Sequence, residues 1–358
     1  MKRKIFISLI AALLCVPLLC VAVVAAEKNG GYKWKSHPED ADISTYTTVD
    51  KKPEKTSVNG PKVYVSSVGR GTGMTCDSPI SDLAAAYDML RGTDGTIVLI
   101  NQVKISKSFH APKHESRIVI TSYDGEKYFN GGLKFGKGLY FRFGGDTVVE
   151  NTAISYTGDC TFVCGFNNVT FGTGLDTPDI SKSGLNVVGG YHLDDNADKV
   201  LYTLAKTVTV ESGNYERIVG YTTGTEADRF VHKFKGTQTL QLNGGKIKQV
   251  CGGPTGFGNG EGVIINVDGA EITEYIHVGG ARPGKCNNAT VNIKSGYVKL
   301  LDMRNVAVKT VINLTGGTVD KFECYNRAEG AKYILNYENV TVPAEALALF
   351  DEVNDKLS

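Results

Sequence analysis

The sequence lacks any apolar run of membrane-spanning length after its first residues. It starts with the basic residues Lys2–Lys4, and an almost continuous apolar run from Ile5 to Val24 leads into Ala25 and Ala26. This pattern is typical of a secretory signal, so we predict a signal peptide over residues 1–26 and a secreted or cell-surface protein. Retention of the run as a membrane anchor stays open, because its length approaches that of a spanning helix.

An excess of positive charge is also missing. Without the three signal cations, 36 Lys and Arg residues (39 − 3) stand against 38 Asp and Glu residues, a formal charge of 36 − 38 = −2. A protein that binds nucleic acid or an anionic membrane surface needs a basic face. We therefore expect no nucleic-acid partner, and no membrane partner after signal cleavage.

Paired CxxC motifs and Asp-rich calcium loops do not occur, so we expect no metal site and no cofactor. Two of the cysteines after the signal, Cys160 and Cys164, would lie roughly 13 Å apart in one strand, too far for a direct bond. Buried thiols are favoured over disulfides, but the pairing state stays open. The six cysteines concerned are Cys76, Cys160, Cys164, Cys251, Cys286 and Cys324.

Glycine is abundant, with 42 residues, and it marks an internal repeat. Five segments share an apolar-polar alternation, two small residues, any residue and a final apolar residue. Two short strands that meet at a glycine corner cannot bury their inner faces alone, so the pattern predicts stacked turns of chain with parallel strands. The segments are Val208–Tyr215, Leu240–Ile247, Ile265–Ile272, Val291–Val298 and Ile312–Val319, with anchors at Gly213, Gly245, Ala270, Gly296 and Gly317.

The chain divides into four parts: the signal, a polar flexible tether at 27–61, a repeat domain at 62–342 and a C-terminal helix at 343–358. Near the start of the repeat domain we predict a helix around Leu83–Leu90, with Ser78 or Ser81 as its N-cap. After Pro343, apolar residues three and four positions apart indicate the second helix. We expect an all-β fold, a single right-handed parallel β-helix whose two open ends are covered by these capping helices.

The strand at Val63–Val65 with its Gly-rich turn, the helix around Leu83, the strand Gly95–Leu99 and the glycine corners together resemble the pectin-lyase-like superfamily of right-handed parallel β-helix proteins. They resemble more closely the secreted repeat proteins of anaerobic Gram-positive bacteria. The resemblance implies an extracellular protein, and the superfamily includes polysaccharide lyases, glycoside hydrolases and adhesive surface proteins. No lyase signature is present, so no catalytic residue is carried over.

The repeat also predicts which side chains point inward. Positions five residues after each anchor are apolar and are expected inside, namely Ile218, Val250, Tyr275, Leu301 and Phe322. His277 has the same inward parity. Positions six and eight after each anchor are expected outside: Val219, Tyr221, Cys251, Gly253, Ile276, Val278, Asp302, Arg304, Glu323 and Tyr325.

Charged outward positions occur only in the last two repeats, and they supply the candidate site. Asp302 and Glu323 share one position in consecutive turns, about 5 Å apart, which is near the carboxyl separation of a retaining glycosidase. Arg304 and Arg327 are candidates for binding an acidic sugar, and Tyr325 for stacking on a sugar ring. An exposed face on which Arg304 pairs with the carboxylates is the favoured alternative.

One further candidate ligand residue, Arg282, lies in the Gly-rich loop 279–285, which is otherwise an ordinary corner. We expect a non-catalytic extracellular module that binds a polysaccharide or a cell-surface component. The alternative is a polysaccharide lyase or glycoside hydrolase, and a purely structural spacer stays open as a third possibility. A lyase would also need a base and charge neutralisation at the uronate, for which no carboxylate cluster is evident.

Overall fold

The computed structural model describes residues 46–180, 184–190, 203–204, 206–221, 232–256, 258–281 and 284–356 of the 358. These residues belong to one compact unit, Asp42–Ser358. The predicted signal at 1–26 and the first part of the tether lie outside the described residues. The fold is all-β, since 51% of the residues are in strands and 4% in helices.

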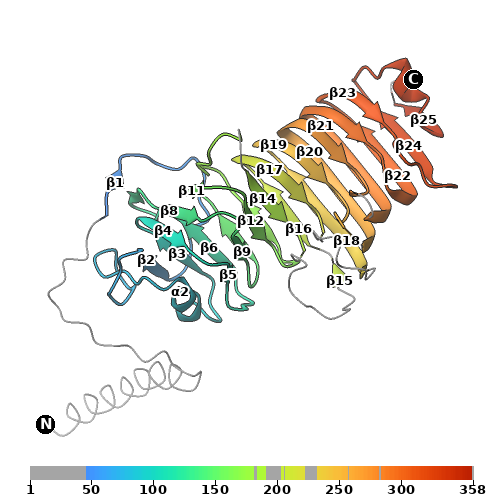
Figure 1. The fold of residues 1–358 in the computed structure, drawn as a ribbon. Helices are drawn as coiled ribbons and strands as arrows, with labels where there is room; N and C mark the ends of the chain where they lie inside the picture. The colour runs from blue at the N-terminus through green and yellow to red at the C-terminus, as the bar shows by residue number, and fades with distance from the viewer. Residues whose placement is uncertain are drawn as a thin grey trace, which may run out of the picture. The chain divides into compact units, whose positions relative to one another are not determined.

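One parallel ladder runs through the unit, because successive segments of the chain each pair with the next (Figure 1). Neighbouring strands of such a ladder lie about 4.8 Å apart. We call residues that occupy equivalent positions in consecutive strands a register row. The ladder contains β2 (Lys62–Val65), β3 (Gly95–Leu99), β6 (Ile118–Thr121), β10 (Thr147–Val149), β13 (Val169–Phe171), β16 (Thr207–Val210), β18 (His232–Leu242), β20 (Gly258–His277), β21 (Lys285–Asp302), β22 (Val306–Leu314), β24 (Lys332–Tyr337) and β25 (Glu352–Asp355).

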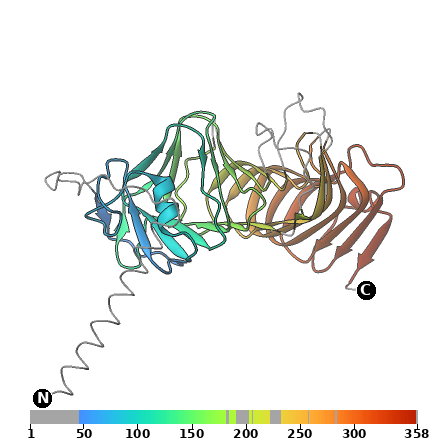
Figure 2. The ribbon, with the colours of Figure 1, turned by 90° about the horizontal axis from the view of Figure 1, so that it is seen from below.

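A second parallel ladder is built from the segments that follow the corners of the first (Figure 2). It contains β5 (Phe109–His110), β9 (Tyr140–Arg142), β12 (Cys160–Val163), β14 (Leu185–Val188), β17 (Asn214–Val219), β19 (Lys246–Cys251), the ends of β20 and β21, and β23 (Thr318–Glu323). The chain thus returns repeatedly to the next place in the same ladders, an order compatible with a β-helix.

Shorter pairings complete the strand list. β4 (Gln102–Ile105), β8 (Gly132–Phe135) and β11 (Ala153–Tyr156) form a third parallel set. β15 (Thr203–Leu204) pairs with the start of β18. β1 (Thr48–Val49) pairs antiparallel with β7 (Tyr128–Phe129). Residues 46–61, at the end of the predicted tether, therefore lie against the sheets: Thr56 and the backbone N–H of Ser57 also donate to Glu150.

The repeat alignment is confirmed in register. Val208 pairs with Leu240, which pairs with Ile265, and the row continues through Val291 and Ile312. All five side chains are completely buried, so the apolar rows of the repeat are the inner faces of the strands.

The prediction of outward residues is wrong for seven of the ten positions, which are buried: Val219, Tyr221, Cys251, Gly253, Ile276, Val278 and Asp302. In β20 the register itself is also displaced. Here the pairing shifts by one residue between Ile272 and Ile276, so that β20 holds one residue more than β19 and β21. Ile276, not Tyr275, joins the inward row, and His277 moves to the row expected outside. In β20 the prediction was wrong because a β-bulge inserts a residue without changing the apolar pattern around it.

The predicted N-terminal helix is present as α2 (Leu83–Met89). It packs on β2 through buried residues that include Leu83, Ala86 and Tyr87. Its N-cap is Asp82 and not Ser78 or Ser81, because the Asp82 carboxylate accepts the backbone N–H groups of Ala84 and Ala85 at 2.8 and 3.3 Å.

The C-terminal helix predicted over 343–358 is wrong for most of its length. A single turn, α3 (Ala344–Leu347), is followed by β25, which pairs with β24. A strand is favoured over a helix here because the open edge of β24 presents unpaired backbone groups, which a strand can pair with and a helix cannot. Leu347 and Phe350 still pack on the core, which explains why the apolar spacing resembled that of a helix.

One outward register row is made of amides, and we call it the amide row. Asn266 donates to Gln241 at 2.8 Å, and each later amide donates to the one before it at 2.7–2.9 Å. The row thereby links six consecutive strands through side chains as well as backbone. Its members are Gln241, Asn266, Asn292, Asn313, Asn336 and Asn354.

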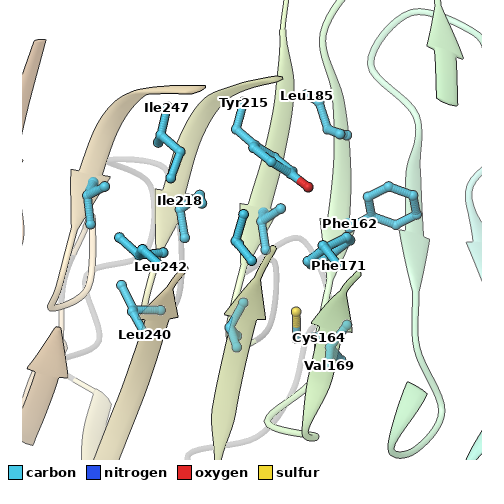
Figure 3. Packing of buried hydrophobic residues seen from close by; sticks show 14 of the residues in the cluster. Phe162, Cys164, Val169, Phe171, Leu185, Tyr215, Ile218, Leu240, Leu242 and Ile247 are labelled. Carbon is cyan, nitrogen blue, oxygen red and sulfur yellow. The ribbon is translucent and has the colours of Figure 1, made fainter. Parts of the chain in front are cut away.

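The interior changes character along the unit (Figure 3). In the earlier turns it is aromatic: the Phe162 ring lies 5.3–5.9 Å from four other phenylalanine rings. In the later turns it consists mainly of Ile, Leu and Val. Of the six cysteines, four are buried thiols, as expected, whereas Cys76 and Cys324 are partly exposed.

Candidate functional site

The two candidate carboxylates lie in adjacent strands, as predicted. Asp302 at the end of β21 is the register partner of Glu323 at the end of β23. The same row continues backwards through His277 and Cys251. Four side chains with ionisable groups therefore follow one another at the steps of the second ladder.

Asp302 is completely buried, although its position was expected outside. One carboxylate oxygen accepts the backbone N–H groups of Arg304 and Tyr325 at 3.0 and 3.3 Å. The other accepts the Arg304 Nε at 2.5 Å and also pairs with a terminal guanidinium nitrogen. With both oxygens bound inside the protein, Asp302 holds the chain at this corner and does not reach solvent.

Glu323 has a different environment. It is partly exposed and forms an ion pair with Lys321, from the same strand. The two carboxylates therefore share a register row but not an environment. Asp302 forms an ion pair with Arg304, the pairing that the favoured alternative expected, but Asp302 is buried and not on an exposed face. Of the two carboxylates, only Glu323 is open to solvent.

Tyr325 is exposed, with 57% of its surface accessible, and it is the one aromatic among the exposed large apolar side chains of the described residues. The Arg304 guanidinium lies 5.2 Å from the ring centroid. Directly after each of these residues the chain turns at an asparagine with positive φ, at Asn305 (58°) and Asn326 (61°). Asparagine tolerates this left-handed conformation, which ends both strands at the same corner.

His277 was expected inside the core. In the structure it belongs to the outward row of the second ladder, although it is buried there. Its ring stacks on that of Tyr275, with centroids 3.8 Å apart and 11° between planes. Burial, and then the Arg304 charge, lower the pKa of His277 to about 4, so the imidazole is neutral at pH 7. Its Nδ1 is buried without a hydrogen-bond partner among the described residues.

A chain of hydrogen bonds crosses three neighbouring strands beside His277. The Arg217 Nε donates to the Gln249 side-chain oxygen at 2.8 Å, and the Gln249 amide donates to Glu274 at 2.7 Å. All three side chains are partly exposed. Sequence reasoning missed them, although Arg217, Gln249 and Glu274 all stand four residues after a repeat anchor. That position is polar in four of the five repeats, with Leu300 as the exception.

Arg327, another candidate ligand residue, is engaged elsewhere. Arg327 donates to the carbonyl oxygens of Ala331 and Leu349 and pairs with Asp351, so it fastens the segment that leads into β25. Its guanidinium also lies 4.4 Å from the Tyr333 ring centroid. Arg282 lies outside the described residues.

This arrangement argues against binding of an acidic sugar, because both candidate arginines are paired with carboxylates. Arg304 is neutralised by Asp302, and Arg327 by Asp351. Within the described part of the chain, no group of three or more His, Cys, Asp or Glu side chains is arranged to hold a metal ion. No helix there has both the length and the apolar character needed to cross a bilayer.

Comparison with protein-family models, with curated proteins and with solved structures finds no match for this chain.

Proposed function

We propose that the chain is a secreted, right-handed parallel β-helix of the pectin-lyase-like type. The two continuous parallel ladders support this architecture, as do α2 against β2 and α3 beside β23. The basic and apolar start of the sequence supports secretion.

On this scaffold, the function that we propose is non-catalytic binding of an extracellular glycan or another cell-surface component. The observation that carries it is the exposed Tyr325 ring with Arg304 beside it. An exposed tyrosine provides a flat apolar surface with a polar hydroxyl, the combination that contacts the C–H face and the hydroxyls of a sugar. The Asp302 ion pair holds Arg304, and hence Tyr325, at the corner of the strands.

Binding is favoured over hydrolysis because the carboxylate pair cannot act together. A glycosidase acid and its partner must both reach the scissile bond. Asp302 has no solvent-accessible surface, and its oxygens already accept three hydrogen bonds and form the ion pair with Arg304. The adjacency of Asp302 and Glu323 is the one feature that favours an enzyme, so the test includes turnover.

The experiment incubates the purified protein with immobilised plant, mucin and bacterial glycans. Retention on the glycan and release of reducing or unsaturated ends are both recorded. We expect retention without products, weakened about tenfold by Tyr325→Ala, since buried aromatic contacts dominate such interfaces. Val308→Ala is the matched control, because Val308 is similarly exposed (53%) on β22. Product formation that Glu323→Gln abolishes would instead support the hydrolase or lyase.

A further inference from the structure

We propose that Arg217, Gln249 and Glu274, with Tyr275, form a second contact point for a neutral, hydroxyl-rich polysaccharide that lies across the strands towards Tyr325. This inference rests on the proposed function and specifies its ligand. The residues come from β17, β19 and β20, and Tyr325 follows β23, so the surface crosses five consecutive strands of the second ladder. At about 4.8 Å per step it spans about 19 Å.

The chemistry of the three polar side chains suits sugar hydroxyls. A guanidinium only donates hydrogen bonds, a carboxylate only accepts them, and an amide does both. These groups are planar, partly exposed and held in a fixed order by the bonds of 2.8 and 2.7 Å between them. Because neighbouring hydroxyls of a sugar each donate and accept, this sequence of groups can bind them in pairs.

The bulge in β20 is what brings Glu274 and Tyr275 to this surface together. Between the pairs Ile247–Ile272 and Gln249–Tyr275, β20 has two residues, Thr273 and Glu274, opposite the single Lys248 of β19. Tyr275 thereby becomes the register partner of Gln249, while Glu274 accepts the Gln249 amide. Bulges of this kind re-aim side chains and are frequent next to binding sites. Below them the neutral His277 supports the Tyr275 ring by stacking, and its buried Nδ1 has no protein partner among the described residues.

The positive and negative side chains of this surface balance one another, which favours a neutral ligand. Glu274, bound to the same Gln249, offsets the charge of Arg217. Further along, Arg304 is paired with Asp302, and Lys321 with Glu323. Arg217, Arg304 and Lys321 therefore each have an acidic neighbour, so a uronic acid at these side chains gains no uncompensated positive charge and must lose its hydration.

Calorimetric titration of the protein with neutral gluco-oligosaccharides from disaccharide to hexasaccharide, and with oligogalacturonates of the same lengths, tests the inference. We expect affinity for the neutral series to rise with length. Gln249→Ala should weaken hexasaccharide binding about 3- to 10-fold, the cost of lost hydrogen bonds, and flatten the length dependence. Gln241→Ala is the matched control: it removes an amide of equal size and similar exposure from the other ladder.

A second variant reports on charge. Glu274→Gln keeps the shape of the side chain but leaves Arg217 without its acidic neighbour, so binding of oligogalacturonate should strengthen relative to the neutral series. Thermal unfolding of each variant checks that the fold is retained. Unchanged binding by Gln249→Ala while Tyr325→Ala weakens it, or a wild-type preference for oligogalacturonate, overturns this inference and leaves the proposed function standing. Absence of any oligosaccharide or glycan binding overturns both.

Discussion

The turns before residue 190 and those after residue 207 belong to the same ladders. They differ in the side chains that pack inside them and in the additional pairings that link neighbouring turns. The earlier turns pack phenylalanine rings around Phe162 and contain the extra strands β4, β8 and β11. The later turns bury aliphatic rows and add the amide row on their surface. Parallel backbone pairing therefore tolerates different interiors, whereas a regular side-chain row needs turns that repeat in sequence.

The largest effect is expected in the aromatic part. Phe162→Ala should lower the free energy of unfolding by about 3–5 kcal/mol, because four neighbouring rings lose their common partner. Urea denaturation followed by circular dichroism measures it. Ile265→Ala in the aliphatic part is the comparison, with a cost of about 2–5 kcal/mol. A clearly smaller loss for Phe162→Ala would show that the aromatic interior is not the more tightly packed of the two.

The second largest effect is expected from removal of the buried Asp302 carboxylate. Asp302→Ala leaves Arg304 and two backbone N–H groups without their acceptor, so we expect a loss of about 3 kcal/mol in unfolding free energy. The matched control is Glu323→Ala, which removes an exposed pair worth less than about 1 kcal/mol. Equal losses for the two variants would contradict the structural role assigned to Asp302.

Acid should destabilise the protein through its buried histidines. The pKa of His277 is about 4 in the folded chain, against 6.5 when unfolded, so the unfolded state binds more protons between these values. Stability is complete above about pH 6.5 and falls as the pH drops to about 4. Because solvent near the ring screens part of the effect, we expect about 1–2 kcal/mol.

His277→Phe, which keeps a ring against Tyr275, should remove most of this pH dependence, as measured by thermal unfolding at pH 7.5, 5.5 and 4.5. A remainder is expected from His114 in the earlier turns, whose pKa burial also lowers. An unchanged pH profile in His277→Phe would show that His277 is not the group that titrates.

A smaller effect is expected in the amide row. Asn292→Ala breaks two links in its middle and should cost about 1 kcal/mol, because the freed amides regain water. Hydrogen exchange of β21 and β22 locates the loss. Asn354→Ala breaks only the link to Asn336 in this row and should cost less. If both variants cost the same, the row does not act as a connected chain.

The smallest effect is a gain. Thr209 precedes Gln241 in the same register row, at the boundary between the two parts. Thr209→Asn should extend the amide row by one strand and raise the unfolding free energy by about 0.5 kcal/mol in urea denaturation. A loss of stability would mean that the row depends on features of the later turns that its register does not capture.

Most of the fold was predictable where the sequence repeats. Val208 and its four equivalents were aligned correctly because each burial position recurs with the same neighbours. The amide row is present in the same alignment, at Gln241, Asn266, Asn292 and Asn313, but the alignment alone does not show that these side chains bond to one another. The site was less predictable: Asp302 and Glu323 were placed together, whereas Tyr275 and His277 were misplaced by one bulge.

By itself, the sequence determined the period, the parallel register and the apolar inner rows, because these follow from alternation and glycine corners that each repeat carries locally. Only the tertiary structure decided that Asp302 is buried, that β20 holds an extra residue and that Glu352–Asp355 is a strand. Each of these depends on what the neighbouring turn offers: a guanidinium to neutralise a carboxylate, a partner strand that accepts a bulge, or an open edge to be paired.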